Sequence, residues 1–278
     1  MYFVSTLSVL TLTRNRSDHL QNLLKGLALS SRLPDECIVV HMNEPAQGLG
    51  NWPFPCHHST YENAEIPLPL TGARNAAAER ATGDLLLFLD VDCIPAKEMV
   101  AEYEKAWAQR PNAIAMGNVH YLPKKITTDW TEDSIKAQSD PHPNRDITGL
   151  APLTKEENYG LFWSLSFALS HSLFNQLGGF SDGYPGYGAE DTDFSWKARA
   201  KGIDLYWVPE ALAFHQFHAS VVPPWQHFES IVYNAKVFYE RWGEWPMGGW
   251  LKVFADEGYI SWSLESDRLD IICLPTQA

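Results

Sequence analysis

The sequence predicts an α/β fold in which helices flank a mostly parallel central sheet. Through its first third, apolar runs of strand length alternate with segments of helical periodicity. Parallel strands need a crossover connection, which is usually helical, so this alternation favours a doubly wound sheet. The 278 residues and 45% apolar content suffice for one large domain with appendages or for two smaller domains.

The first strand is expected at 7–12, within a segment (1–13) that lacks the basic region of a signal peptide. Ser17 is a plausible N-cap for the helix that follows. One face of this helix carries a set of leucines at helical spacing, namely Leu20, Leu23, Leu24 and Leu27. The run CIVVH at 37–41 predicts a second strand.

A second helix is expected to begin at Thr71–Gly72 and to close near Gly83. Arg74 and Asn75 would then lie in its first turn, where free backbone amides and the helix dipole favour a phosphate. The alternative is a solvated arginine on a surface helix. The three polar strand exits at 11–16, 41–44 and 90–92 would converge on one crevice.

The apolar run at 85–89 predicts a buried strand that delivers Asp90 and Asp92 at its end. Side chains two residues apart in an extended chain point the same way, so both carboxylates can reach one hard cation. A divalent ion held there is suited to gripping a diphosphate, which suggests metal-assisted transfer from a nucleotide donor. The pattern alone also fits one aspartate capping a helix and one solvated aspartate.

The middle of the chain holds few candidate site residues. Apolar positions at helical spacing predict a core-facing helix at 97–110, and the polar stretch 119–158 is expected to be a loop that either covers the substrate or is partly mobile. The segment 51–69 is expected to be a loop that could include a short edge strand. Its Cys56-His57-His58 cluster does not predict zinc, because three adjacent residues cannot comfortably face one tetrahedral ion.

Five glycines between 178 and 188 predict a tightly turning loop whose backbone can approach a ligand. The loop leads into Glu190 and Asp191 at the start of a helix that is expected to end near Gly202. A carboxylate at a helix N-terminus stays ionised, which suits a general base or an acceptor that orients sugar hydroxyls. Simple acidic capping is the alternative.

A further strand is expected at 203–208, and two histidines follow, His215 and His218. Either could complete a metal site, although their spacing alone specifies none. The aromatic-rich tail predicts a helical extension, so the expected domains are 1–220 and 221–278. Its tryptophans favour a helix core or a subunit interface over a platform for sugar rings.

Taken in order, these motifs resemble a known family. TLTRN, TGARNAAAERATGDLLLFLDVDCIP, FWSLSFALS, LGGFSDGYPGYGAEDTDFSWKARAKG and AFHQ are similar to segments of nucleotide-sugar glycosyltransferases of the GT-A fold. The resemblance is to bacterial family-2 enzymes and to galactosyl- and N-acetylgalactosaminyltransferases. It covers Ser5 to His218, and the order of the motifs is more specific than any single motif.

The resemblance implies roles for several residues on the donor side. Its nucleotide-binding set would include Glu44 near the base or ribose, with the others along the first strand and second helix: Thr11, Thr13, Arg14, Arg74 and Asn75. Asp90 would face the ribose and the metal, while Asp92 and His215 would bind Mn²⁺ or Mg²⁺ directly.

On the acceptor side, the resemblance implies that Glu190 and Asp191 hold the donor sugar and the acceptor. In inverting relatives the second acid is the base, which makes Asp191 the candidate here. Trp163 would line the acceptor side. The expected reaction is transfer of a Gal-, GalNAc- or Glc-type sugar from a nucleotide donor, with a UDP-sugar favoured, to a saccharide or glycoconjugate hydroxyl with inversion.

Composition narrows the remaining possibilities. A formal charge of −13 argues against a nucleic-acid partner, and no apolar stretch approaches the length of a membrane span. Four scattered cysteines fit a reduced cytoplasmic protein, and the oligomeric state stays open. Two alternative functions stay open as well: a haloacid-dehalogenase-like phosphatase, suggested by LLFLDVDCI, and a non-catalytic carbohydrate-binding protein.

Overall fold

The computed structural model describes residues 6–66, 68–219 and 221–275. Most of its strands form one large sheet, in the order β3-β2-β1-β4-β9-β6-β10-β5, with β7 and β8 attached to β6 and β10. The strands of this sheet are β1 (Leu7–Thr13), β2 (Glu36–Met42), β3 (Cys56–Tyr61), β4 (Leu85–Leu89), β5 (Cys93–Pro95), β6 (Ile114–Tyr121), β7 (Asp140–Pro141), β8 (Thr154–Glu156), β9 (Ser166–Ser170) and β10 (Leu205–His215).

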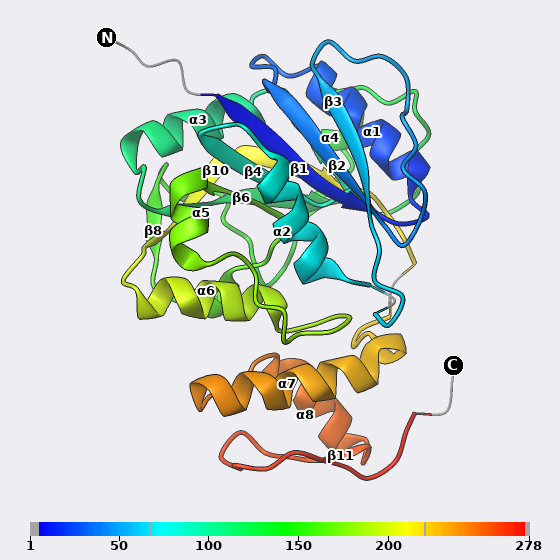
Figure 1. The fold of residues 1–278 in the computed structure, drawn as a ribbon, viewed down its shortest axis with the longest axis vertical. Coiled ribbons are helices and arrows are strands. Elements are labelled where there is room, and N and C mark those ends of the chain that lie inside the picture. The colour runs from blue at the N-terminus through cyan, green and yellow to red at the C-terminus, as the bar shows by residue number, and fades with distance from the viewer. Residues whose placement is uncertain (1–5, 67, 220, 276–278) are drawn as a thin grey trace.

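Helices cover both faces of the sheet, and two more lie beyond α6 as a separate layer (Figure 1). Their bounds are α1 (Ser17–Ala28), α2 (Leu70–Arg80), α3 (Met99–Gln109), α4 (Glu132–Lys136), α5 (His171–Leu177), α6 (Glu190–Ala200), α7 (Phe228–Trp242) and α8 (Gly248–Asp256), with 3-10 turns η1 (Tyr159–Leu161) and η2 (Trp225–His227). One core cluster joins the sheet to α2, α5 and α6, and a second joins its other face to α1 and α3. The predicted fold class is therefore confirmed.

The strands β1, β2, β3 and β4 pair in parallel, as the alternation of strands and helices predicts. The short edge strand that 51–69 could include is β3. The first strand begins at Leu7 in the structure, and positions 1–5 of the segment assigned to it lie outside the described residues.

Three features differ from the sequence expectations. The strands β6 and β9 were not predicted, and β9 enters the sheet antiparallel to β4 and β6. The strand expected at 203–208 continues to His215, because a register shift between Val208 and Leu212 lets β10 pass Pro209 and keep its pairing with β6. The expected loop at 119–158 contains α4, β7 and β8 instead of being uniformly irregular.

The C-terminal helices α7 and α8 share an apolar cluster with β11 (Ile260–Ser261), which pairs with β12 (Asp270–Ile271). Most of the tryptophans and phenylalanines of the tail pack in this cluster, as the helix-core interpretation predicts. The extension also reaches the glycine-rich loop, because the Asn234 amide of α7 donates to the carbonyl of Gly188 at 2.8 Å. The domain boundary near 220 stays a prediction.

Among the helices that the structure describes, none combines the length and the apolar character that a membrane crossing requires.

Candidate functional site

The ends of β1 and β2 meet through Glu44. Its carboxylate accepts a hydrogen bond from the Asn15 backbone N–H at 2.7 Å, and its other oxygen lies 3.2 Å from His41 Nδ1. Three predicted nucleotide contacts lie on the same β1 end, namely Thr11, Thr13 and Arg14. Thr11 Oγ1 is buried and has no hydrogen-bond partner. The parallel pairing of β1 and β2 thus gathers four of the predicted residues at one edge of the sheet.

Asp92 lies beside two histidines. Its carboxylate oxygens are 3.6 Å from His215 Nε2 and 3.4 Å from His218 Nε2, and one of them also pairs with Arg16 Nη1 at 3.3 Å. One ligand atom from each of Asp92, His215 and His218 lies within 4.8 Å of the others. Burial opposes ionisation of Asp92, but the two histidines and Arg16 outweigh it and lower the pKa of that carboxyl well below its usual range.

Strand pairing creates this arrangement. β5 runs antiparallel to the end of β10 and sets Cys93 opposite His215. The backbone N–H of Gln216 then donates to the Asp92 carbonyl at 2.6 Å. Residues separated by more than a hundred positions in the chain therefore face each other at one strand end.

Asp90 does not belong to this three-residue set. One of its oxygens lies 3.7 Å from Arg74 Nη2, and Arg74 Nη1 donates to Glu190 at 3.2 Å. Burial raises the pKa of Asp90 to about 7; Arg74 opposes this effect, and nearby Asp92 adds to it. The predicted contact between Asp90 and a metal stays a prediction, and the structure gives Asp90 an ionic partner in Arg74.

Arg74 is buried and lies in the second turn of α2, so both the expected first-turn position and the solvated alternative are wrong. The helix begins at Leu70, because the Pro69 carbonyl already accepts from the Ala73 N–H. Asn75 is engaged elsewhere: its amide exchanges two hydrogen bonds of 2.8 Å with the backbone of Phe180. It fixes the glycine-rich loop, and its predicted contact with the diphosphate stays a prediction.

The glycine-rich loop delivers Glu190 and Asp191 at the first turn of α6, as predicted. Glu190 accepts from the Gly188 N–H at 3.0 Å, and Ala189 adopts a left-handed conformation with φ 65°. Burial first and neighbouring Glu190 second raise the pKa of Asp191 to about 6, against the expected effect of the helix N-terminus. The pKa of Asp191 therefore lies close to neutral pH, which suits a general base.

Trp163 lies among cationic and aromatic groups. The Arg145 guanidinium is 4.6 Å from its ring centroid, and the His142 ring meets it edge-on at 5.0 Å. His142 is also 5.3 Å from the Tyr121 ring, which stacks on His215 at 4.6 Å. A chain of rings thus links the predicted acceptor residue to the histidine pair.

Sequence reasoning did not select three of the residues that now stand out. His218 is one of two candidate histidines in the sequence, but a histidine spacing of three specifies no site without the β5–β10 pairing. Arg16 lies in the noted strand exit, yet only the fold brings it to Asp92. Arg145 lies in a stretch that has no pattern in the sequence.

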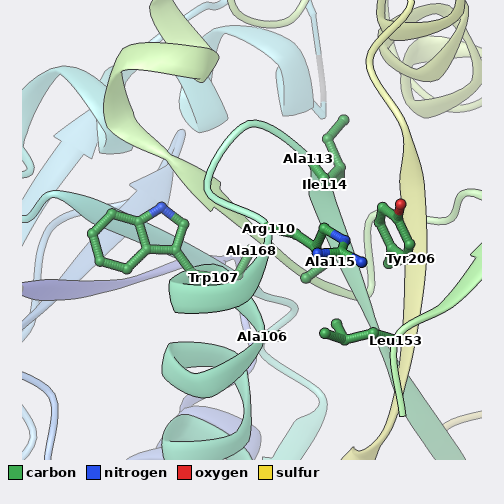
Figure 2. Close-up of a pocket in the computed structure, with 9 residues that line it drawn as sticks. All are labelled: Ala106, Trp107, Arg110, Ala113, Ile114, Ala115, Leu153, Ala168 and Tyr206. Atoms are coloured by element: carbon green, nitrogen blue, oxygen red, sulfur yellow. The ribbon is translucent and has the colours of Figure 1, made fainter. Parts of the chain in front are cut away.

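A surface depression between α3 and the neighbouring strands β6 and β10 lies apart from these residues (Figure 2). Trp107, Arg110, Leu153 and Tyr206 contribute its larger side chains. None of the predicted site residues lines this depression. The candidate site is the group of polar residues at the carboxyl ends of the strands and at the start of α6, described above.

Comparisons of the sequence agree with this fold. Residues 8–178 match glycosyl transferase family 2, and residues 147–219 match the N-terminal domain of galactosyltransferase. The first match spans more than half of the chain. The chain therefore belongs to glycosyl transferase family 2. The predicted family resemblance is confirmed. A comparison with curated proteins gives no significant match.

Solved structures of GT-A glycosyltransferases share the fold. GalNAc-T7 with UDP, GalNAc and Mn²⁺ superposes with a TM-score of 0.60 at 16% identity, covering 87% of this chain and 51% of that one. S. aureus TarS 1–349 in complex with UDP gives 0.57 at 16% identity, covering 84% and 65%. This chain thus spans between half and two thirds of the length of these neighbours.

Proposed function

We propose that this chain transfers a sugar from a nucleotide diphosphate donor, with a UDP-sugar favoured, to a hydroxyl of a saccharide or glycoconjugate. The observation that carries the proposal is the convergence of Asp92, His215 and His218 next to the electrostatically linked group formed by Arg74, Asp90, Glu190 and Asp191. The set Asp92, His215 and His218 suits a divalent metal ion. The second group would hold the general base, Asp191, near the buried guanidinium of Arg74. Family membership does not support the phosphatase alternative.

The donor set fits a divalent metal. Two imidazole nitrogens and one carboxylate favour Mn²⁺ over Mg²⁺, because Mg²⁺ prefers an all-oxygen shell. When bound there, the ion would supply Lewis-acid stabilisation to the leaving diphosphate. The relative crystallised with UDP and Mn²⁺ supports the same choice of metal and nucleotide.

The protein groups then have separate tasks. Arg74 lies beside Asp90 and Arg16 beside Asp92, and their positive charge would offset the repulsion between these carboxylates and a bound diphosphate. Glu190, tied to Arg74 and to the Gly188 N–H, would orient donor-sugar hydroxyls. Asp191 would accept the proton of the attacking hydroxyl, and a single displacement from the opposite face would invert the anomeric centre.

The test is thermal stabilisation by UDP, GDP, CDP and dTDP, each with Mn²⁺, Mg²⁺ or EDTA. We expect UDP with Mn²⁺ to raise the melting temperature most, and the variants His215→Ala and His218→Ala to lose this effect. His57→Ala is the matched control, since the His57 side chain is 61% exposed and lies outside the metal set. Stabilisation that persists in EDTA, or in both site variants, would contradict the proposal.

We also propose that the protein is located in the cytoplasm. It rests on the scattered cysteines, all of which are free thiols in the structure.

A further inference from the structure

Cys37 and Cys56 lie opposite each other on neighbouring strands. They are partners in the parallel register of β2 and β3, and the Cys37 thiol donates a hydrogen bond to the Cys56 sulfur. Residues directly opposite each other on paired strands lie about 5 Å apart, within the range of Cα separations that a disulfide spans. β3 is the edge strand of the sheet (Figure 1), so it can adjust toward β2 without disturbing a strand on its other side.

His58 lies beside the Cys56 sulfur and can take its proton. The two residues are two apart in one strand, so their side chains share a face of the sheet, and His58 Nε2 lies 3.4 Å from Cys56 Sγ. His58 Nδ1 is 3.1 Å from His41 Nε2, which also accepts from the Gln47 backbone N–H at 3.4 Å. Because His41 Nε2 is an acceptor, Nδ1 of His58 carries the proton between the two rings. His58 Nε2 is therefore the nitrogen that receives a proton from Cys56.

The two sulfurs consequently differ in reactivity. The hydrogen bond from Cys37 and the nearby His58 lower the pKa of Cys56 to about 5, against the opposing effect of burial. The same hydrogen bond and burial raise the pKa of Cys37, which keeps its proton. Cys37 is fully buried whereas Cys56 is only partly buried, so an oxidant meets Cys56 first. The pair thus offers one accessible thiolate and one thiol held next to it.

We propose that Cys56 and Cys37 form a reversible redox pair that hydrogen peroxide oxidises to a disulfide. The Cys56 thiolate attacks one peroxide oxygen, the O–O bond breaks as the S–O bond forms, and the leaving hydroxide takes the proton of His58 Nε2 to become water. The Cys37 sulfur then attacks the Cys56 sulfenic acid. The S–O bond breaks, the S–S bond forms, and hydroxide leaves with the Cys37 proton as a second water. In total, two electrons pass from the sulfurs to the peroxide.

The test treats the full chain with hydrogen peroxide, blocks the remaining thiols with iodoacetamide and maps the products by mass spectrometry. Trypsin followed by cyanogen bromide, which cuts at Met42, places Cys37 in the fragment 33–42 and Cys56 in the fragment 43–74. We expect these two fragments to be joined, the number of free thiols to fall from four to two, and dithiothreitol to restore all four. No nucleotide or metal is needed, so the result is independent of the proposed transferase function.

Cys37→Ala removes the resolving thiol, so the Cys56 sulfenic acid should persist and its labelling by dimedone should rise at least about fivefold. Cys93→Ala is the matched control, because Cys93 is as buried as Cys37 but lies on β5. It should leave the labelling and the disulfide unchanged. Peroxide that leaves all four thiols free would overturn the proposal, as would a disulfide that joins Cys56 to Cys273 of a second copy. Both results come from the unmodified protein, so they do not depend on how the variants fold.

Discussion

At the scale of single residues, burial decides the electrostatics of this site more than local sequence does. Asp191 begins a helix, a position that normally favours an ionised carboxylate, yet burial and neighbouring Glu190 raise its pKa to about 6. Asp92, also buried, is driven the opposite way by two histidines and Arg16. Two aspartates of one site thus receive different roles from their surroundings.

The raised pKa of Asp191 predicts the pH dependence of the reaction. Below about pH 6 the carboxyl is protonated and cannot accept a proton, so kcat/KM should fall as the pH decreases through that value. Asp191→Asn should reduce kcat by at least about 100-fold and leave UDP affinity unchanged. Kinetics from pH 4.5 to 8 on both proteins measure this effect.

The raised pKa of Asp191 also predicts how the Asp191→Asn substitution affects stability, which serves as the control that this variant folds. The folded pKa of Asp191 lies above the ordinary value of 3.8, so the native state binds more protons than the unfolded state between these values. Asp191 therefore lowers stability at neutral pH, and Asp191→Asn should melt no lower than the unmodified protein at pH 7. A large loss of UDP affinity in this variant would sink the base assignment.

Cys56 offers a second residue-scale prediction, outside the site. The Cys37 thiol donates to Cys56, and although burial opposes the effect, His58 at 3.4 Å adds to it and the pKa of Cys56 falls to about 5. Its alkylation by iodoacetamide should already be near its maximum at pH 6.5, because the thiolate is the reactive form. Mass spectrometry of labelled peptides measures the rate, with Cys56→Ser as the blank. A rate that keeps rising through pH 8.5 would contradict the assignment.

At the scale of elements, the site depends on how α2 holds the glycine-rich loop. Asn75 donates to and accepts from the Phe180 backbone, and Gly179, at φ 59°, lies so close that a Cβ there would be 2.6 Å from Asn75 Oδ1. A side chain at 179 would collide with this amide. The loop that presents Glu190 is thereby tied to the helix that carries Arg74.

Asn75→Ala should therefore lower the free energy of unfolding by about 1–3 kcal/mol, because the buried N–H and C=O of Phe180 lose their partners. Urea denaturation measures the change. Asn51→Ala removes the same amide from an exposed loop and should shift stability by less than about 0.5 kcal/mol. Equal effects of the two substitutions would argue against a bracing role for Asn75.

At the scale of the whole molecule, the C-terminal helices are joined to the candidate site. Asn234 of α7, fully buried, donates to the carbonyls of Pro185, Tyr187 and Gly188. Asp193 of α6 accepts from the Trp242 indole at 2.9 Å and pairs with Arg241 at 3.0 Å. The extension thus supports the loop and helix that carry Glu190 and Asp191.

We predict that Asn234→Ala destabilises the protein by about 1–3 kcal/mol and increases protease cleavage within 183–188, since three loop carbonyls lose their donor. Limited proteolysis with mass spectrometry locates the cut. Tyr233→Ala is the control on the same helix, because Tyr233 is 54% exposed. Cleavage at the same rate in both variants would show that the loop is held by other contacts.

Much of the fold could be predicted from periodicity. The strands β1, β2 and β4 and the helices α1, α2, α3 and α6 follow patterns that are local in the chain. β6 and β9 escaped prediction for different reasons: Gly117 and Asn118 interrupt the apolar run of β6, whereas β9 has only five residues and owes its place to pairing with two distant strands. The extension of β10 past Pro209 depends on a register shift that only the sheet shows.

The sequence by itself determined the α/β class, the family and the segments that bear the chemistry, because strand and helix periods and motif order are properties of neighbouring residues. Tertiary structure alone decided which side chains meet. His218 and Arg16 join Asp92 through strand ends far apart in the chain, and Arg145 is placed between two tryptophans. Burial and charge proximity depend on the packed fold, so the pKa values follow from it and not from the order of residues.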